Sequence, residues 1–272
     1  MQKRGAARRT VKFLGAVLAA ALLIYALVSY LFLPTLWRHF EGAERVANLA
    51  LVTKTSLGIP GDALNVALEG SAGDVLCALL AAGWAPADVT TLRSSLKIAG
   101  SVIFDTPYAT APVSDLFYGG VKQDMAFQKA AGRSAGTRHH VRFWRALGAE
   151  GASRALWVGA VTFDRSVGLS AYTGQITHHI DADIDSERDQ LTEDLAEAGV
   201  AESVSQVSGV GPTFFARNGG GDYYFTDGEM AVTKLSQDCK ATQKPAAPSS
   251  VSAQIGLKNR LFALFAALWR RL

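Results

Sequence analysis

Residues Thr173 to Asp189 read T-G-Q-I-T-H-H-I-D-A-D-I-D-S-E-R-D and hold two of the chain's five histidines, four aspartates and one glutamate. If the stretch is extended, alternate side chains point to opposite faces of a strand. One of these faces then carries His179, Asp181, Asp183 and Asp185. The next residues, Ser186 to Ala198, have the apolar spacing of an amphipathic helix. The stretch therefore predicts a strand with a polar edge that leads into a helix.

Strand patterns lie on both sides of this stretch and are separated by turn residues. They occupy residues 64–68, 124–129, 138–146, 156–163, 203–207, 213–217, 222–226 and 229–235. One helical pattern runs from Ser71, with Asp74 completing a capping box, to Gly83. A second lies within residues 86–104, with the apolar residues Leu92, Leu96, Ile98 and Ala99. Helices combined with short, mostly antiparallel strands predict an α+β domain at residues 63–236.

An uncharged run of 21 residues, Phe13 to Leu33, precedes the domain. At about 1.5 Å per residue, a helix of this length spans the roughly 30 Å hydrocarbon core of a bilayer. Residues 1–12 are basic and contain no acid, so they predict a cytoplasmic tail before an uncleaved transmembrane helix at 13–33. The domain would then lie outside the cytoplasmic (inner) membrane, in a periplasm. Residues 34–62 predict an amphipathic stalk, helical from His39 to Ile59.

The C-terminal residues predict a linker followed by a surface helix. Residues 237–254 have the Pro, Ser and Ala content of a flexible linker. Residues 255–272 predict an amphipathic helix whose uncharged core is too short to cross a bilayer. We expect contact with the membrane surface or a partner protein, with packing on the chain's own domain as the alternative. The contact residues would be Leu257, Leu261, Leu264, Phe265, Leu268 and Trp269.

Charge and cysteine content limit the possible partners and compartments. The net charge is only +3, and basic residues gather at the two termini. This distribution favours a lipid bilayer as partner, and no nucleic-acid-binding motif accompanies it, so we expect no nucleic-acid partner. Cys77 and Cys239 form no CxxC pair. They could form a disulfide in an oxidising compartment, but the sequence favours two buried free thiols.

The histidines and aspartates also allow a metal site. His139 and His140 lie on another predicted strand, and one histidine of each pair would face the same side if the two strands were neighbours. The candidate cluster comprises His139, His140, His178, His179, Asp181, Asp183, Asp185 and Asp222. A divalent metal held by His179, Asp181 and His139 would activate a water molecule for hydrolysis.

A structural interpretation of the same residues is favoured over the metal site. Asp185 or Ser186 would cap the following helix, and the histidines would form internal hydrogen bonds. The aspartates could instead pair with Arg142, Arg188 and Arg217 in an ion-pair network. The glycines between Arg217 and Asp222 suit a hairpin turn better than a phosphate loop, because no Lys-Ser/Thr ending and no helix follows them.

Six blocks of sequence, in order, resemble a known family. They are T-L-R-S-S-L (91–96), A-P-V-S (111–114), Q-D-M-A-F-Q-K (123–129), R-H-H-V-R-F-W (138–144), residues 174–189 and G-P-T-F-F-A-R-N-G-G-G-D-Y-Y-F-T-D-G (211–228). Over residues 64–235 the chain is similar to the LssY C-terminal domain family, a bacterial group described as a type I secretion system component. Its members often carry this domain behind multi-span membrane modules, some of them similar to lipid phosphatases. This chain departs from that layout, with one span and no phosphatase motif, so the resemblance carries over no catalytic residue.

The sequence therefore predicts a membrane-anchored extracytoplasmic domain, an accessory or assembly subunit of a bacterial envelope complex with a membrane-protein partner. The alternative is a metal-dependent hydrolase, which requires His179 and Asp181 to face His139 or His140 across the sheet. A third hypothesis, a lipid- or glycan-binding module, requires exposed Trp144 and Trp157 side chains.

Overall fold

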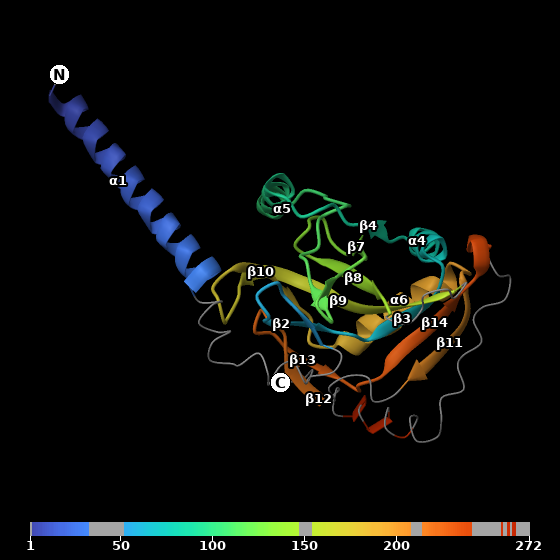
Figure 1. Ribbon diagram of the computed structural model, residues 1–272. Helices are drawn as coiled ribbons and strands as arrows, with labels where there is room; N and C mark the ends of the chain where they lie inside the picture. Colours follow the sequence, from blue (N-terminus) through green and yellow to red (C-terminus); the bar gives the residue numbers. More distant parts are fainter. Residues whose placement is uncertain are drawn as a thin grey trace.

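The computed structural model describes residues 2–32, 52–146, 154–207 and 214–240, together with Leu257, Arg260, Leu261, Ala263 and Leu264. It combines helices with sheets in which every strand pair is antiparallel except one. The predicted α+β class is therefore confirmed. Figure 1 shows a long N-terminal helix leaving one side of this domain.

The N-terminal helix consists of α1 (Gln2–Leu27), which continues into a five-residue π-helix, η1 (Val28–Phe32). Within it, the 22 residues Val11–Phe32 are long and apolar enough to cross a membrane. Almost all of these side chains are exposed, Ser29 being buried. Since a buried core helix would hide its apolar side chains inside the protein, the exposure agrees with the predicted span.

The largest sheet forms the centre of the domain. Its strand order is β11-β14-β3-β9-β8-β7-β4, with β10 also paired to β9. These strands are β3 (Val66–Gly70), β4 (Ala85–Pro86), β7 (Met125–Ala130), β8 (Arg138–Arg145), β9 (Ala155–Leu169), β10 (Ile176–Ile180), β11 (Ala201–Val207) and β14 (Met230–Leu235). Only β14 and β3 run parallel. The long strand β9 pairs with β3 and β8 over its first part and with β10 over its last part.

Two smaller sheets contain the other strands of the described residues. One has the order β2-β1-β5-β6, and the other is the hairpin β12-β13. Their strands are β1 (Val52–Lys54), β2 (Pro60–Ala63), β5 (Phe117–Tyr118), β6 (Val121–Lys122), β12 (Phe214–Arg217) and β13 (Tyr223–Thr226). The stalk helix predicted from His39 to Ile59 is wrong over its described end, because Val52–Lys54 is a strand paired with β2 and β5. The rest of that prediction lies outside the described residues.

The helices described between residues 52 and 240 are α4 (Ala72–Ala81), α5 (Leu92–Phe104), α6 (Ile184–Glu197) and a short 3₁₀ turn, η2 (Gln237–Cys239). The predicted capping box of α4 is confirmed, since Ser71 and Asp74 satisfy each other's backbone N–H groups. The strand predicted through Asp185 is wrong after Ile180, because Asp183 caps α6 by accepting a hydrogen bond from the Ser186 N–H. Neither Asp185 nor Ser186 is therefore the cap.

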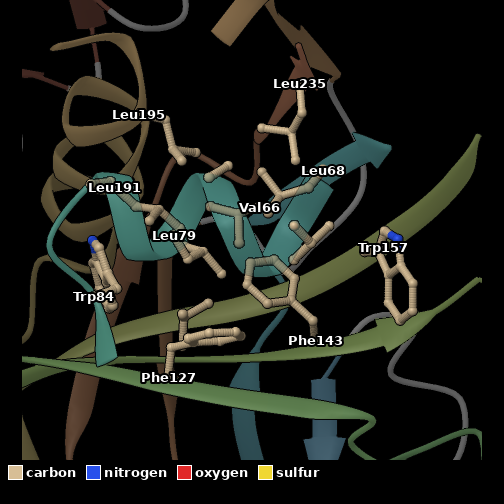
Figure 2. Close-up of a cluster of buried hydrophobic side chains, with 14 of the residues drawn as sticks. Val66, Leu68, Leu79, Trp84, Phe127, Phe143, Trp157, Leu191, Leu195 and Leu235 are labelled. Carbon is tan, nitrogen blue, oxygen red and sulfur yellow. The ribbon is translucent and has the colours of Figure 1, made fainter. Parts of the chain in front are cut away.

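The main hydrophobic core lies between the large sheet and helices α4 and α6. Figure 2 shows Leu79 of α4 and Leu191 and Leu195 of α6 packed over Phe127 and Phe143 of the sheet. Burial of such side chains is the dominant stabilising term in folding. Trp144 is 2% exposed and Trp157 is 6% exposed, so neither offers the exposed aromatic surface that the lipid- or glycan-binding hypothesis required.

A disulfide joins Cys77 of α4 to Cys239 of η2, across 162 positions of sequence. The favoured expectation of two free thiols is therefore wrong. The separation of the two cysteines in sequence gave no indication of this pairing. The disulfide forms because β14 brings the chain back to α4. A hydrogen bond from the Asp238 N–H to Asp74 Oδ1 holds the same two segments together.

Candidate functional site

The register of β8 and β9 places polar residues on the face of the sheet opposite the main core. Arg138 pairs with Asp164, and His140 pairs with Thr162. Alternate residues of β8 share a face, so Arg142 lies on this side too, whereas Val141 points into the core.

Asp164 is the centre of a buried ion cluster. Its Oδ2 accepts a hydrogen bond from Arg138 Nε at 3.0 Å and lies 3.2 Å from His140 Nδ1. His178 Nδ1 is 4.0 Å from the same oxygen. One histidine of each pair therefore does approach the other, but across an aspartate that sequence analysis missed. Asp164 is 1% exposed, and its Oδ1 has no hydrogen-bond partner among the described residues.

A second buried carboxylate extends the cluster. Asp62 Oδ2 accepts a hydrogen bond from Arg142 Nη1 at 2.7 Å and lies 3.7 Å from His140 Nε2. The two arginines also fix the loop that covers this face. Arg138 donates to the carbonyl oxygens of Ala111 and Pro112, and Arg142 donates to Ser114. The A-P-V-S and R-H-H-V-R-F-W blocks thus meet in one network.

Opposite charges within this cluster shift the pKa values of Asp164 and His140. Burial by itself raises the pKa of Asp164, but His140 and Arg138 outweigh it and the pKa falls well below its usual value. Burial lowers the pKa of His140, yet Asp164 outweighs that effect and the net pKa is raised. Asp164 therefore favours the protonated form of His140, and His140 favours the ionised form of Asp164.

The pKa of His178 shifts in the opposite direction from that of His140. Burial lowers the pKa of its imidazole and outweighs the attraction of Asp164. Its Nε2 lies 3.1 Å from the Ala135 carbonyl oxygen and donates to it in the neutral form. A cavity of about 40 Å³ adjoins Ala135 and Arg138. It holds roughly one or two water molecules and is too small for an organic substrate.

His179 faces a separate partner. Its Nδ1 lies 2.7 Å from Asp222 Oδ1, and Asp222 Oδ2 accepts the N–H of Ile180. Asn218 Oδ1 in turn accepts the N–H groups of Gly220 and Asp222. The Arg217–Asp222 segment is therefore a hairpin turn, as the sequence predicted, and Asp222 at its end also binds His179.

His139 and the remaining aspartates are also bonded within the protein. His139 Nδ1 lies 2.7 Å from Glu187 Oε2 of α6. Asp181 Oδ1 accepts the N–H of Asp183, which itself caps α6. His139, His179 and Asp181 therefore each form a hydrogen bond with a different partner. Among the described residues, no three His, Cys, Asp or Glu side chains are placed to share a metal ion.

Asp185 takes part in the ion-pair network that the sequence allowed as an alternative. Arg188 Nη1 donates to Asp185 at 3.3 Å and to Asp227 at 2.8 Å. Asp185 also accepts hydrogen bonds from the Thr226 hydroxyl and the Asp227 N–H. Burial, together with the neighbouring Asp227 charge, raises the pKa of Asp185 to about 6. Arg142 pairs with Asp62 instead, and Arg217 stacks on the Tyr223 ring.

Apolar side chains of the described residues also reach the surface outside these networks. An open groove of about 470 Å³ is lined by Ala72, Gly73, Leu76, Pro86, Met125, Ala126 and Phe127. Of the predicted C-terminal contact residues, Leu257, Leu261 and Leu264 are helical and exposed. The others, Phe265, Leu268 and Trp269, lie outside the described residues.

The fold and the site define an α+β domain with a buried ion cluster, preceded by a helix able to cross a membrane. The family model of the LssY C-terminus matches residues 44–230 of the chain. Because this match covers more than half of the sequence, the chain belongs to the LssY C-terminus family. Neither a curated protein nor a solved structure matches the chain.

Proposed function

We propose that the protein is a membrane-anchored extracytoplasmic domain that serves as an accessory or assembly subunit of a bacterial envelope membrane complex. The observation that carries the proposal is the Cys77–Cys239 disulfide in a domain that follows an apolar helix long enough to cross a membrane. Disulfides persist outside the reducing cytoplasm. The basic residues before the span favour a cytoplasmic N-terminus, which agrees with an external domain.

The accessory role is supported by the way the polar residues are used. Asp164, Asp62 and Asp185 each pair with a buried arginine side chain, which is a structural use of these carboxylates. The surface, in contrast, offers apolar contact area at the groove beside Leu76, which is 42% exposed. Exposed apolar surface of this kind is typical of protein-contact sites.

Thiol labelling of the full chain in intact bacteria tests the compartment. A maleimide reagent that increases the mass of each modified thiol should leave the protein unshifted before reduction and shift it by two additions afterwards. The single-cysteine variant Cys239→Ser is the control and should react once without reduction. Two reactive thiols in the unreduced protein would place the domain in a reducing compartment and contradict the proposal.

Purification in mild detergent tests the subunit role. We expect a membrane protein to elute with the full chain in a fixed ratio and Leu76→Asp to lower that ratio. The new carboxylate would lose its hydration in an apolar contact, which costs binding free energy. The same change at Leu80, which is exposed and lies outside the groove, is the matched control. A chain that elutes alone at native expression levels would argue against an assembly role.

The metal-dependent hydrolase stays as a second, weaker proposal, with a divalent metal as its cofactor. One observation favours it: His139 and His179 each direct Nδ1 at a carboxylate, the arrangement that orients many metal-binding histidines. Against it, the two histidines do not converge with Asp181. Elemental analysis of the purified full chain decides the question. A stoichiometric transition metal that is lost in His179→Ala would support the hydrolase.

A further inference from the structure

Helix α5 carries its large apolar side chains on the surface. Leu92, Leu96 and Ile103 lie at the spacing of one helical face and are 79%, 65% and 74% exposed. Phe104, next to this face, is 75% exposed. A helix of a water-soluble domain normally turns this face inward, so the exposed apolar face of α5 requires a partner.

The inward face of α5 is fixed by contacts that prevent the helix from rotating. Ser94 donates to the Val89 carbonyl oxygen. The Ser101 hydroxyl donates to the Thr106 carbonyl oxygen and accepts the Ala135 N–H at 2.9 Å. Ile98 packs against the small cluster of Tyr108, Ala111 and Ala135. Leu92, Leu96 and Ile103 therefore stay outside.

The charge of α5 suits a lipid surface. Its sequence, L-R-S-S-L-K-I-A-G-S-V-I-F, contains two basic residues and no acidic one. Lys97 extends its ammonium group over the Tyr108 ring at 3.8 Å, and Arg93 is exposed. Apolar residues flanked by basic ones are the composition of helices that lie in the headgroup layer of anionic membranes.

The end of the apolar span is bonded to the domain. Tyr25 donates to the Gly174 carbonyl oxygen at 2.6 Å, Gln175 Nε2 donates to the Ser29 carbonyl oxygen, and the Ile176 N–H donates to the Tyr30 hydroxyl. Tyr25 lies seven residues before the end of the span, about 10 Å along the helix. The turn between β9 and β10 therefore lies level with the last two turns of the span.

The same turn exposes apolar side chains, and hydrogen bonds connect strand β10 to α5. Leu169 and Ile176 are cross-strand neighbours and are 58% and 63% exposed. Further along β10, His178 bonds to Ala135, which in turn bonds to Ser101 of α5. Figure 1 shows α5 and β10 on the side of the domain from which α1 leaves, with β11, β12 and β13 on the opposite side.

We infer that α5 and the β9–β10 turn together rest in the headgroup layer of the bilayer that α1 crosses. This membrane-facing surface comprises Leu92, Leu96, Ile103, Phe104, Leu169 and Ile176. The inference rests on the proposed membrane anchor. The end of this helix determines where the surface lies, and the bilayer that the helix crosses is the apolar partner of the surface. It gives the domain a fixed orientation toward the membrane, with strand β11 turned away from it.

Fluorescence quenching in lipid nanodiscs tests this surface on the full chain. Because the native cysteines form a disulfide, a single introduced cysteine can carry an environment-sensitive NBD label. Three variants are compared: Leu18→Cys within the span, Leu96→Cys on α5, and Val207→Cys at the exposed end of β11. The nanodiscs contain phosphatidylcholine and phosphatidylglycerol, with and without brominated acyl chains as contact quenchers.

We expect brominated lipid to quench the labels at positions 18 and 96 and to leave the label at 207 unchanged. Adding Leu92→Ser and Ile103→Ser to the Leu96→Cys protein should reduce its quenching, because both side chains help hold α5 in the headgroup layer. Quenching at 18 but not at 96 overturns the inference and leaves the anchor standing. An unquenched label at 18 would instead overturn the anchor and, with it, the inference.

Discussion

Asp164 holds three nitrogen-bearing side chains from two strands around one buried oxygen. Replacing it with Asn removes the charge, so Arg138 is buried without its counterion and His140 keeps only Asp62, which also pairs with Arg142. We expect Asp164→Asn to lower the free energy of unfolding by about 3–5 kcal/mol. Chemical unfolding of the full chain in detergent measures the loss. The control, Asp115→Asn, breaks the exposed pair with Lys122 and should cost less than about 1 kcal/mol.

The raised pKa of His140 predicts a dependence of stability on pH. A folded-state pKa above the unfolded value of about 6.5 means that the contribution is complete below that pH. The contribution is lost as the pH rises through the folded pKa. Asp164 acts in the opposite sense, because its lowered pKa gives stability that is lost only in acid.

Thermal melting from pH 5.5 to pH 9 should therefore show a midpoint that falls more steeply for the wild type than for His140→Gln. The comparison isolates His140, since His178 has a lowered pKa and contributes in the opposite direction in both proteins. Equal slopes for the two proteins would contradict a raised pKa, because they would mean that His140 has the same pKa in the folded and unfolded states.

The elements of the domain could largely be predicted from the sequence, and the meeting of its site residues could not. Capping chemistry at Ser71 and the strand pattern at 138–146 are local signals, so they identified α4 and β8. Asp164 was missed because the strand predicted at 156–163 stopped one residue before it, whereas β9 continues to Leu169. Its role depends on the pairing of β8 with β9, which is a non-local property.

The same limit explains the polar stretch around His179. Asp183 and Asp185 leave the strand face because a helix cap and a buried arginine stabilise them elsewhere. Local side-chain hydrogen bonds of aspartate compete with extended structure in this way. Periodicity alone extended the strand too far, since it carries no information about the position of Arg188.

The Cys77–Cys239 disulfide ties α4 to η2, the last described turn of the domain. It closes a loop of 162 residue positions, which restricts the unfolded chain strongly. We expect a reducing agent to lower the free energy of unfolding by about 2–5 kcal/mol. Melting curves with and without reductant measure the change. The double variant Cys77→Ser/Cys239→Ser should melt at the lower temperature and show no further response to reductant.

At the scale of the whole molecule, the joint between span and domain determines how the domain faces the bilayer. Three hydrogen bonds, made by Tyr25, Gln175 and Tyr30, connect the last turns of the span to the β9–β10 turn. None of these side chains belongs to the main core or the ion cluster. Removing them should therefore loosen the orientation of the domain and leave its fold intact.

The triple variant Tyr25→Phe/Tyr30→Phe/Gln175→Ala separates these two properties. We expect its melting midpoint to stay close to that of the wild type, because each lost bond is worth only about 1 kcal/mol near the surface. A label at position 96 should nevertheless be quenched less by brominated lipid, since α5 would spend part of its time away from the bilayer.

Asn65→Ala is the control for a change that affects the fold and not the joint. Asn65 bonds to the backbone of Val161 and Ile184 inside the domain, so its loss should lower the melting midpoint without acting on the joint. Unchanged quenching in the triple variant would show that α5 holds its position on the membrane without the joint.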